Sequence, residues 1–258
     1  MGRGLGCVGF GLACCAGIGA ANAALVSIQN PSFEADFAGP ASFPVLIPQG
    51  WSLHDPNSIV DQTQDAVGVV NPTDSTFFES GVPDGNNAAL IFLAGDRGGG
   101  EVSLEQTLSV TLQPNTRYRL TVGVGNIASG FGAPPFDQFF DLDGFPGYRI
   151  QLRAGDTVIA EDNNSLAGSL EEGTFGTSEI TVTIGATHAD LGEALSIRLT
   201  NLNQLGTQDE PGIEVDFDHV QLDATAVPEP GVMAGWTGLA LAGWVLLRRG
   251  GWGRMVRK

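Results

Sequence analysis

A segment rich in aromatic and acidic residues is the strongest candidate for chemistry in this chain of 258 residues. It spans residues 126–147 and holds Phe131, Phe136, Phe139, Phe140, Phe145, Asp137, Asp141 and Asp143. Aromatic rings can stack on the C–H face of a sugar, while carboxylates accept protons from its hydroxyl groups. The segment therefore predicts a ligand loop for carbohydrate. The alternative is that the phenylalanines fold back and form a small hydrophobic cluster at the end of the domain.

No catalytic motif stands out elsewhere in the sequence. The three histidines, His54, His188 and His219, are far apart, and neither an HExxH nor a GxSxG motif occurs. Acidic residues are too numerous for one pair of hydrolytic carboxylates to be singled out. We therefore expect a protein without enzymatic activity.

The charge balance argues against one class of partner. Residues 24–226 hold 28 of the 29 acidic residues, six arginines and no lysine, which is a formal net charge of −22. Such a surface repels the phosphate backbone, so we expect no binding to nucleic acid. It also offers many carboxylates to calcium.

Apolar and polar residues alternate in several segments that are separated by turn-forming residues. These segments are 102–110, 118–124, 148–152, 180–184 and 195–199. Alternation of this kind is typical of strands with one buried face. The continuous apolar run 88–94 predicts a strand that is buried on both faces. The expected fold is all-β, a single jelly-roll-like β-sandwich over residues 24–226.

The first 23 residues have the pattern of a signal peptide. Arg3 precedes an apolar stretch, and Ala21-Asn22-Ala23 has the small residues that a cleavage site needs. Cleavage after Ala23 would remove all three cysteines. The predicted mature chain therefore has no disulfide and no thiolate metal site.

Residues 227–258 combine three features in a fixed order. The motif Val227-Pro228-Glu229-Pro230 comes first, an uncharged run over 232–247 follows, and Arg248-Arg249 ends that run. As a helix the run would span about 24 Å, which is short of the roughly 30 Å hydrocarbon core. Since arginines favour the cytoplasmic side, the domain would lie outside. The run predicts a transmembrane helix that holds the protein transiently in the inner membrane; a permanent anchor is the alternative.

In this order the three features resemble the PEP-CTERM sorting signal of Gram-negative bacteria. The resemblance implies an exosortase as the processing partner, which would act near Pro-Glu-Pro. It also implies export across the inner membrane to the cell surface or extracellular matrix. The expected organisation is a signal peptide (1–23), a β-sandwich domain (24–226) and a sorting signal (227–258).

Short motifs spread over the domain carry a second resemblance. They are Asn30-Pro31-Ser32-Phe33-Glu34, Gly50-Trp51, and the segments 104–108, 118–122 and 215–222. In this order they resemble the galactose-binding-like jelly rolls of carbohydrate-binding modules. The resemblance implies one structural Ca²⁺ between the first and last strands, with Glu34 and Asp218 as ligands.

The sequence around Asp218 gives an independent reason to expect something unusual there. The apolar alternation slips by one residue between Phe217 and Val220. A β-bulge at Asp218-His219 would cause this slip and turn Asp218 inward. A buried carboxylate needs a partner, and a cation is one. The alternative is that Glu34 and Asp218 accept hydrogen bonds from backbone amides.

Together these features predict an exported, non-enzymatic matrix or surface protein that is sorted by an exosortase and associates with extracellular polysaccharide. A structural surface protein without a glycan ligand is one alternative. A small carbohydrate-active enzyme is another.

Overall fold

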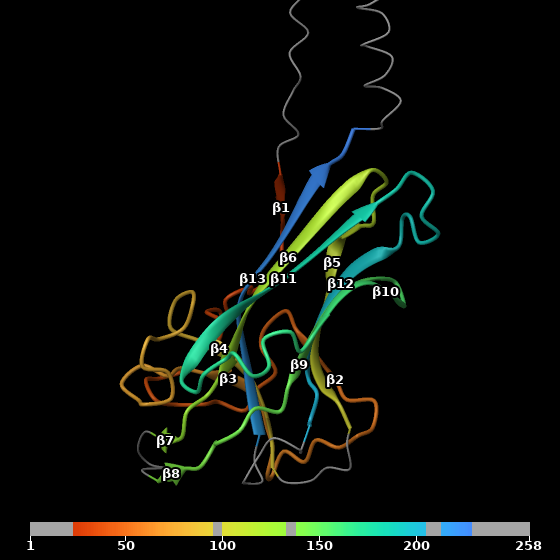
Figure 1. The fold of residues 1–258 in the computed structure, drawn as a ribbon. Coiled ribbons are helices and arrows are strands. Elements are labelled where there is room, and N and C mark those ends of the chain that lie inside the picture. The colour runs from red at the N-terminus through yellow and green to blue at the C-terminus, as the bar shows by residue number, and fades with distance from the viewer. Residues whose placement is uncertain (1–22, 95–99, 133–137, 205–212, 229–258) are drawn as a thin grey trace, which may run out of the picture.

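The computed structural model describes residues 23–94, 100–132, 138–204 and 213–228. These residues form two antiparallel sheets that pack face to face, with a short hairpin near one end (Figure 1). The strands are β1 (Ala24–Val26), β2 (Ser52–His54), β3 (Ala66–Val70), β4 (Ala88–Leu93), β5 (Val102–Thr111), β6 (Thr116–Asn126), β7 (Gly130–Phe131), β8 (Phe139–Phe140), β9 (Tyr148–Ala154), β10 (Thr157–Asn163), β11 (Thr174–Ile184), β12 (Ala194–Asn201) and β13 (Ile213–Ala226).

The two sheets have different strand orders. Sheet A runs β11-β6-β13-β4-β3, with β1 also paired to β13, and sheet B runs β10-β9-β12-β5-β2. Strands β7 and β8 form the separate hairpin. Because β1 pairs with the end of β13, both ends of the described domain leave from one end of the sandwich, opposite the β7–β8 hairpin (Figure 1).

The predicted all-β sandwich is confirmed. The alternating segments become β5, β6, β9, β11 and β12, because every second side chain of these strands enters the space between the sheets. Leu104, Leu120, Ile150, Leu199 and Phe217 meet there, and none is more than 1% exposed.

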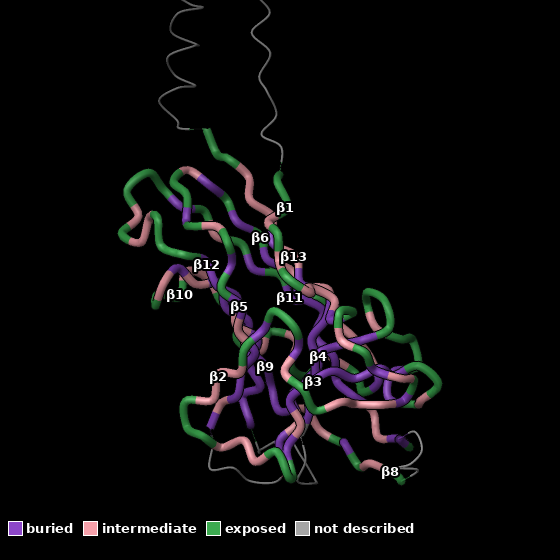
Figure 2. Tube along the Cα trace, turned by 180° about the vertical axis from the view of Figure 1, so that it is seen from behind, coloured by how far each residue is buried: buried purple, intermediate pink, exposed green. Residues whose placement is uncertain are grey.

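Strand β4 is buried on both faces, as its apolar run predicts. Ile91 and Leu93 face the sandwich core, whereas Leu90 belongs to a second cluster on the outer face of sheet A. Figure 2 shows β3 and β4 as largely buried segments. Chain segments around Phe43, Phe77, Ile127 and 140–142 cover the outer face here, so a cavity can form between them and sheet A.

The predicted bulge is present in β13. The pairing of β13 with β6 shifts register between Asp218 and Gln221, and His219 has a φ of 51°. Asp218 is fully buried. The extra residue lets Phe217 and Val220 both reach the core, which explains the slip in the sequence pattern.

A buried polar network joins the neighbouring edges of the two sheets. Tyr148 Oη and Ser178 Oγ donate to Asp162 Oδ2 at 2.6 and 2.5 Å. The Ser165 backbone N–H and hydroxyl donate to the same carboxylate at 3.0 and 2.8 Å. Asp162 lies on β10 of sheet B and Ser178 on β11 of sheet A, so this carboxylate connects edges that no backbone ladder connects.

The terminal predictions fall largely outside the described residues. Ala21, Glu229, Pro230, Arg248 and Arg249 lie there, as does the apolar run 232–247, whereas Ala23, Val227 and Pro228 are described and exposed. Within the described ranges, no helix is long and apolar enough to cross a membrane.

Candidate active site

Three carboxylates lie side by side along the outer face of β13. Glu214, Asp216 and Asp218 occur at every second position and alternate with Val215 and Phe217, which face the sandwich core. All three carboxylates are nevertheless buried: Glu214 is 6% exposed, and Asp216 and Asp218 are 0% exposed. Ionised side chains are rarely buried without partners, so a row of three buried carboxylates is unusual.

Small and flat neighbours make room for the acidic row. Asp216 lies opposite Gly125 of β6, and the Phe175 ring covers that glycine. A Cβ atom at Gly125 would lie 2.7 Å from the Phe175 ring and 3.0 Å from Asp216 Cβ. Glycine is therefore required here for close approach of the ring and the carboxylate-bearing strand.

A cavity of about 260 Å³ opens above this face of sheet A. Its sheet-side wall includes Leu90 and Phe92 of β4, and Glu214 is the acidic group contributed by β13. The roof and sides include Phe43, Phe77 and Phe140. The remaining lining residues are Val45, Gln62, Thr63, Gln64, Asp65, Ala66, Val70, Ile127 and Leu142. The cavity is thus mostly apolar and aromatic, with two buried carboxyl groups, those of Glu214 and Asp65, and one polar side.

Burial changes the acidity of the two carboxyl groups nearest the cavity. It raises the pKa of Glu214 to about 7. Burial, followed by the nearby charge of Glu214, raises the pKa of Asp216 well above its ordinary value. Apart from the interaction of these two carboxyl groups with each other, neither Asp216 oxygen nor Glu214 Oε1 has a hydrogen-bond partner among the described residues. The pair therefore holds protons near neutral pH and can present an acidic O–H to a molecule in the cavity.

The structure brings Glu34 and Asp218 to the same loop, at residues 84–87. Glu34 Oε1 accepts the backbone N–H groups of Asn86 and Asn87 at 2.7 and 2.6 Å. Asp218 Oδ2 accepts the Asp84 N–H at 2.7 Å. Burial raises the pKa of Asp218 to about 7, although its hydrogen bonds oppose the rise. The structure therefore shows the alternative arrangement, in which Glu34 and Asp218 accept hydrogen bonds from backbone amides.

The same place offers oxygen donors of the type that calcium prefers. Glu34 and Asp218 each carry a carboxylate, and Asn87 Oδ1 is buried without a hydrogen-bond partner among the described residues. Calcium takes six to eight oxygens and accepts amide and backbone carbonyl ligands. Within the described ranges, no three His, Cys, Asp or Glu side chains form a metal-binding group. A calcium ion here would therefore need amide, carbonyl or water oxygens as well.

The predicted ligand loop divides into three parts. Phe140 enters the cavity wall, whereas Phe131 and Phe139 are exposed and pack on each other with ring centroids 5.4 Å apart. Phe145 packs against Tyr148 at 6.2 Å. Asp141 and Asp143 both accept the Ser129 hydroxyl. Phe136 and Asp137 lie outside the described residues.

The alternative of a small hydrophobic cluster is also present at this loop. A separate buried cluster contains Phe77, Phe78, Ile127 and Leu142, and Phe140 packs on it. The loop therefore does two things at once: it builds a satellite core and supplies one aromatic wall of the cavity.

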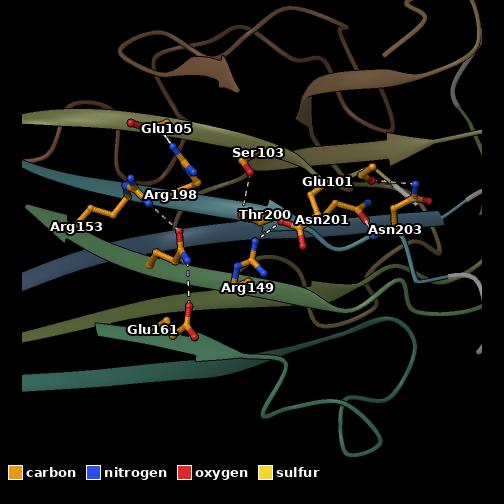
Figure 3. Close-up of polar contacts among 12 residues, drawn as sticks. Glu101, Ser103, Glu105, Arg149, Arg153, Glu161, Arg198, Thr200, Asn201 and Asn203 are labelled. Carbon is orange, nitrogen blue, oxygen red and sulfur yellow. Dashed lines mark hydrogen bonds and ion pairs between the residues drawn. The ribbon is translucent and has the colours of Figure 1, made fainter. Parts of the chain in front are cut away.

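The outer face of sheet B carries another group of charged residues, which are partly buried (Figure 3). Arg198 donates to Glu105 at 2.7 Å, and Arg149 pairs with Glu101. Ser103 and Thr200 share a hydrogen bond of 2.9 Å beneath them. Arg198 and Arg149 are each paired with a glutamate here, whereas Glu214 on sheet A has no basic partner among the described residues.

The sandwich domain matches one known protein family over nearly its whole length. Residues 24–223 match the family model described as HpiC1-like, HpiC1 cyclase. The chain belongs to this cyclase family. No curated protein matches the chain.

Solved structures of cyclases from Fischerella sp. TAU agree with this membership. The Stig cyclase Fisc, in complex with (3Z)-3-(1-methyl-2-pyrrolidinylidene)-3H-indole, is 36% identical with a TM-score of 0.69. A cyclase in complex with 4-(1H-indol-3-yl)butan-2-one has the same identity and TM-score. Each match covers 80% of this chain and 100% of the other chain.

Family membership corrects the predicted function. The chain is not identified as a PEP-CTERM protein with a carbohydrate-binding-like domain, and the prediction of a non-enzymatic, exosortase-sorted protein with a polysaccharide partner is wrong. The alternative of a small carbohydrate-active enzyme is nearer to this finding, because it predicts an enzyme. The family, however, is one of cyclases. The resemblance to carbohydrate-binding modules was right about the sandwich and wrong about the activity, because one fold carries both binders and enzymes.

Glu214 and Asp216 are the residues that sequence reasoning missed. A signal for them existed: Glu214, Asp216 and Asp218 put three acids on one face of a single strand, next to the apolar face that was recognised. The aromatic partners Phe43, Phe77 and Phe92 had no such signal, because they meet only through the sheet and its covering loops.

Proposed function

We propose that this cyclase closes a ring in an indole-bearing substrate by acid catalysis in the cavity above sheet A. The observation that carries the proposal is the buried Glu214 carboxyl group in a mostly apolar and aromatic cavity. The indole compounds bound to the two Fischerella cyclases support the substrate class.

The proton balance of such a reaction needs only the carboxyl group. Glu214 gives its O–H proton to a basic or π-rich atom of the substrate, which becomes a cation. A carbon–carbon double bond of the same molecule attacks the cation and forms the new ring bond. A proton then leaves the cyclised cation and returns to the carboxylate. The product is an isomer of the substrate, so no oxidant or reductant is consumed.

The cavity walls suit a cationic intermediate. The ring faces of Phe43, Phe77 and Phe140 supply quadrupoles that attract a nearby cation. Apolar walls also exclude water, which would otherwise capture the cation before the ring closes. Asp216, buried beside Glu214, keeps negative charge away from the donor by remaining protonated itself.

The direct test is whether turnover gives a product with the same mass as the substrate. Purified protein is incubated with an indole that carries an unsaturated side chain, and the product is analysed by mass spectrometry and NMR. The expected product has the mass of the substrate and one ring more. Addition of water or loss of two hydrogens would contradict an acid-catalysed isomerisation.

The pH dependence of turnover follows from Glu214. The donor must carry its proton, and the raised pKa of about 7 means that it loses this proton as pH rises through neutrality. We expect kcat to be level below about pH 6 and to fall about tenfold per pH unit well above 7. Melting temperatures over the same range check that the fold persists. A rate that rises with pH would instead indicate a general base.

We also infer that one Ca²⁺ is held between the first segment and the last strand, with Glu34 and Asp218 as ligands. Bound there, the ion would neutralise the buried Asp218 carboxylate and the exposed Glu34 carboxylate and tie the chain before β2 to β13. Asn87 Oδ1, left without a partner, supports this inference.

Calcium should therefore stabilise the fold. At a concentration about 100 times the Kd, calcium stabilises by about 2.7 kcal/mol, which is roughly 5–10 °C in melting temperature for a domain of this size. EDTA should reverse the shift, and Glu34→Gln should abolish the response to calcium. Glu179→Gln, an exposed substitution on β11, is the matched control. An unchanged midpoint in EDTA and in calcium would contradict the site.

A further inference from the structure

The polar side of the cavity comes from a single turn. Apart from Glu214, all the polar lining residues lie in 62–65. Gln62, Thr63 and Gln64 are exposed at the mouth, whereas Asp65 is only 3% exposed. A substrate that enters this apolar cavity therefore meets hydrogen-bonding groups on one side only.

Asp65 holds this turn to the sheet. Its Oδ2 accepts the Asp61 N–H at 2.6 Å, and its Oδ1 accepts the N–H of Ala94 at 2.7 Å, just beyond the end of β4. The turn is closed by the N–H groups of Gln64 and Asp65, which donate to Asp61 O at 2.8 and 2.7 Å. One buried carboxylate thus joins the two ends of the turn and fixes it against β4.

The geometry places the turn within reach of a molecule that also contacts Glu214. Ala66, which follows the turn, pairs with Phe92, and Phe92 pairs with Glu214 across the next ladder. Two strand spacings separate Ala66 from Glu214, which is about 10 Å. A bicyclic aromatic molecule can bridge that distance, with one end at the acid and its other edge at the turn.

Gln64 has an acceptor that suits an aromatic N–H. Its Nε2 donates to Asp61 Oδ2 at 3.3 Å, which sets the orientation of the amide. Among the described residues, no donor reaches Gln64 Oε1. An uncharged acceptor at the mouth of an apolar cavity can bind a ring N–H without placing a second charge near the cation formed at Glu214.

We propose that the turn 61–65 determines substrate specificity, with Gln64 accepting the indole N–H and Asp65 as the residue that positions the turn. This inference rests on the proposed indole cyclase function and extends it to the orientation of the substrate. An indole held by its N–H at the mouth presents its remaining edge and side chain to Glu214 in one orientation.

The test compares two probes by titration calorimetry: 4-(1H-indol-3-yl)butan-2-one and its N-methylindole analogue. Wild-type protein should bind the N–H probe about tenfold more tightly, the effect of one hydrogen bond. Gln64→Ala should remove this discrimination by weakening only the N–H probe. Asp65→Asn should reduce it as well, because the turn loses one of its two backbone contacts. In turnover, both variants should raise KM and leave the pH dependence of kcat unchanged.

Asp55→Asn is the matched control for Asp65. Asp55 also caps two backbone N–H groups, those of Ile59 and Val60 at 3.0 Å each, but it does not line the cavity. It should lower the melting temperature as Asp65→Asn does and leave the discrimination intact.

The outcomes separate the two proposals. Binding of both probes with discrimination that survives Gln64→Ala and Asp65→Asn would overturn the role of the turn and leave the cyclase proposal standing. Failure of wild-type protein to bind either probe would overturn the indole cavity and this inference with it. Equal loss of discrimination in Asp55→Asn would show a general loosening of the loop and overturn the specific role of Asp65.

Discussion

Replacing Glu214 with glutamine should lower kcat about 10²- to 10⁴-fold, the usual contribution of a general acid. The amide has nearly the same shape as the carboxyl group but no acidic proton, so the cavity persists while proton donation ends. Affinity for 4-(1H-indol-3-yl)butan-2-one should change little. Steady-state turnover and calorimetry on the same preparation measure the two effects separately.

The controls for Glu214→Gln come from the same sheet. Glu179 on β11 is exposed and paired with Arg119, so Glu179→Gln should leave turnover unchanged. Because the substitution also removes a buried acid, Glu214→Gln should retain or raise the melting temperature at pH 8, where the carboxylate would otherwise be buried as an anion. Full activity of Glu214→Gln would refute Glu214 as the proton donor.

Replacing Asp162 with alanine should give the largest loss of stability away from the cavity. The change leaves the Tyr148 and Ser178 hydroxyls and the Ser165 N–H without their common acceptor. Each unsatisfied buried group costs about 1–3 kcal/mol, and partial relaxation suggests a total of about 3 kcal/mol. The expected fall in melting temperature is roughly 6–12 °C, measured by calorimetry or circular dichroism.

The pH dependence of this loss has a definite sign. Burial opposes ionisation of Asp162, but hydrogen bonds from Ser178, Tyr148 and Ser165 outweigh it and lower the pKa. Stability from this group is therefore fully present above its ordinary pKa near 3.8 and is lost as pH falls through the lowered value. The gap between wild type and Asp162→Ala should narrow in acid. Asp156→Ala, at the exposed β9–β10 turn, should change stability by less than about 0.5 kcal/mol.

The strands could be predicted because their determinants are local. Alternation at period two identifies a half-buried strand without knowledge of its partners, and β6 and β11 follow that rule over much of their length. The run that became β4 was recognised as buried on both faces. Even the bulge at Asp218-His219 could be predicted, since a slip in alternation is visible in one segment.

The site could not be predicted in the same way. Segment 126–147 is rich in aromatic and acidic residues, yet of its described phenylalanines only Phe140 lines the cavity, and Asp141 and Asp143 accept the Ser129 hydroxyl. Content alone does not reveal which rings face a cavity and which face solvent. No sequence motif marks Glu214, because its raised pKa comes from burial beneath loops that are remote in sequence.

The resemblance to carbohydrate-binding jelly rolls shows how a correct fold can accompany a wrong function. The motifs around Glu34 and Asp218 belong to the contact between the first segment and the last strand, and a sandwich with this contact can bind sugars or catalyse. In the proposed function, the activity depends on what covers the outer face of sheet A. Here the cover is largely apolar and aromatic, and burial beneath it raises the pKa of Glu214 to about 7.

By itself, the sequence determined the all-β class, the positions of the long strands and the acidic character of the domain, because these depend on side-chain type and spacing within single segments. Only the tertiary structure decided that Glu214 and Asp216 would be buried together and that Phe43, Phe77 and Phe140 would line one cavity with Glu214. The physical reason is that a raised pKa and an apolar cavity are properties of a desolvated volume. That volume exists only after segments distant in sequence have packed over one face of a sheet.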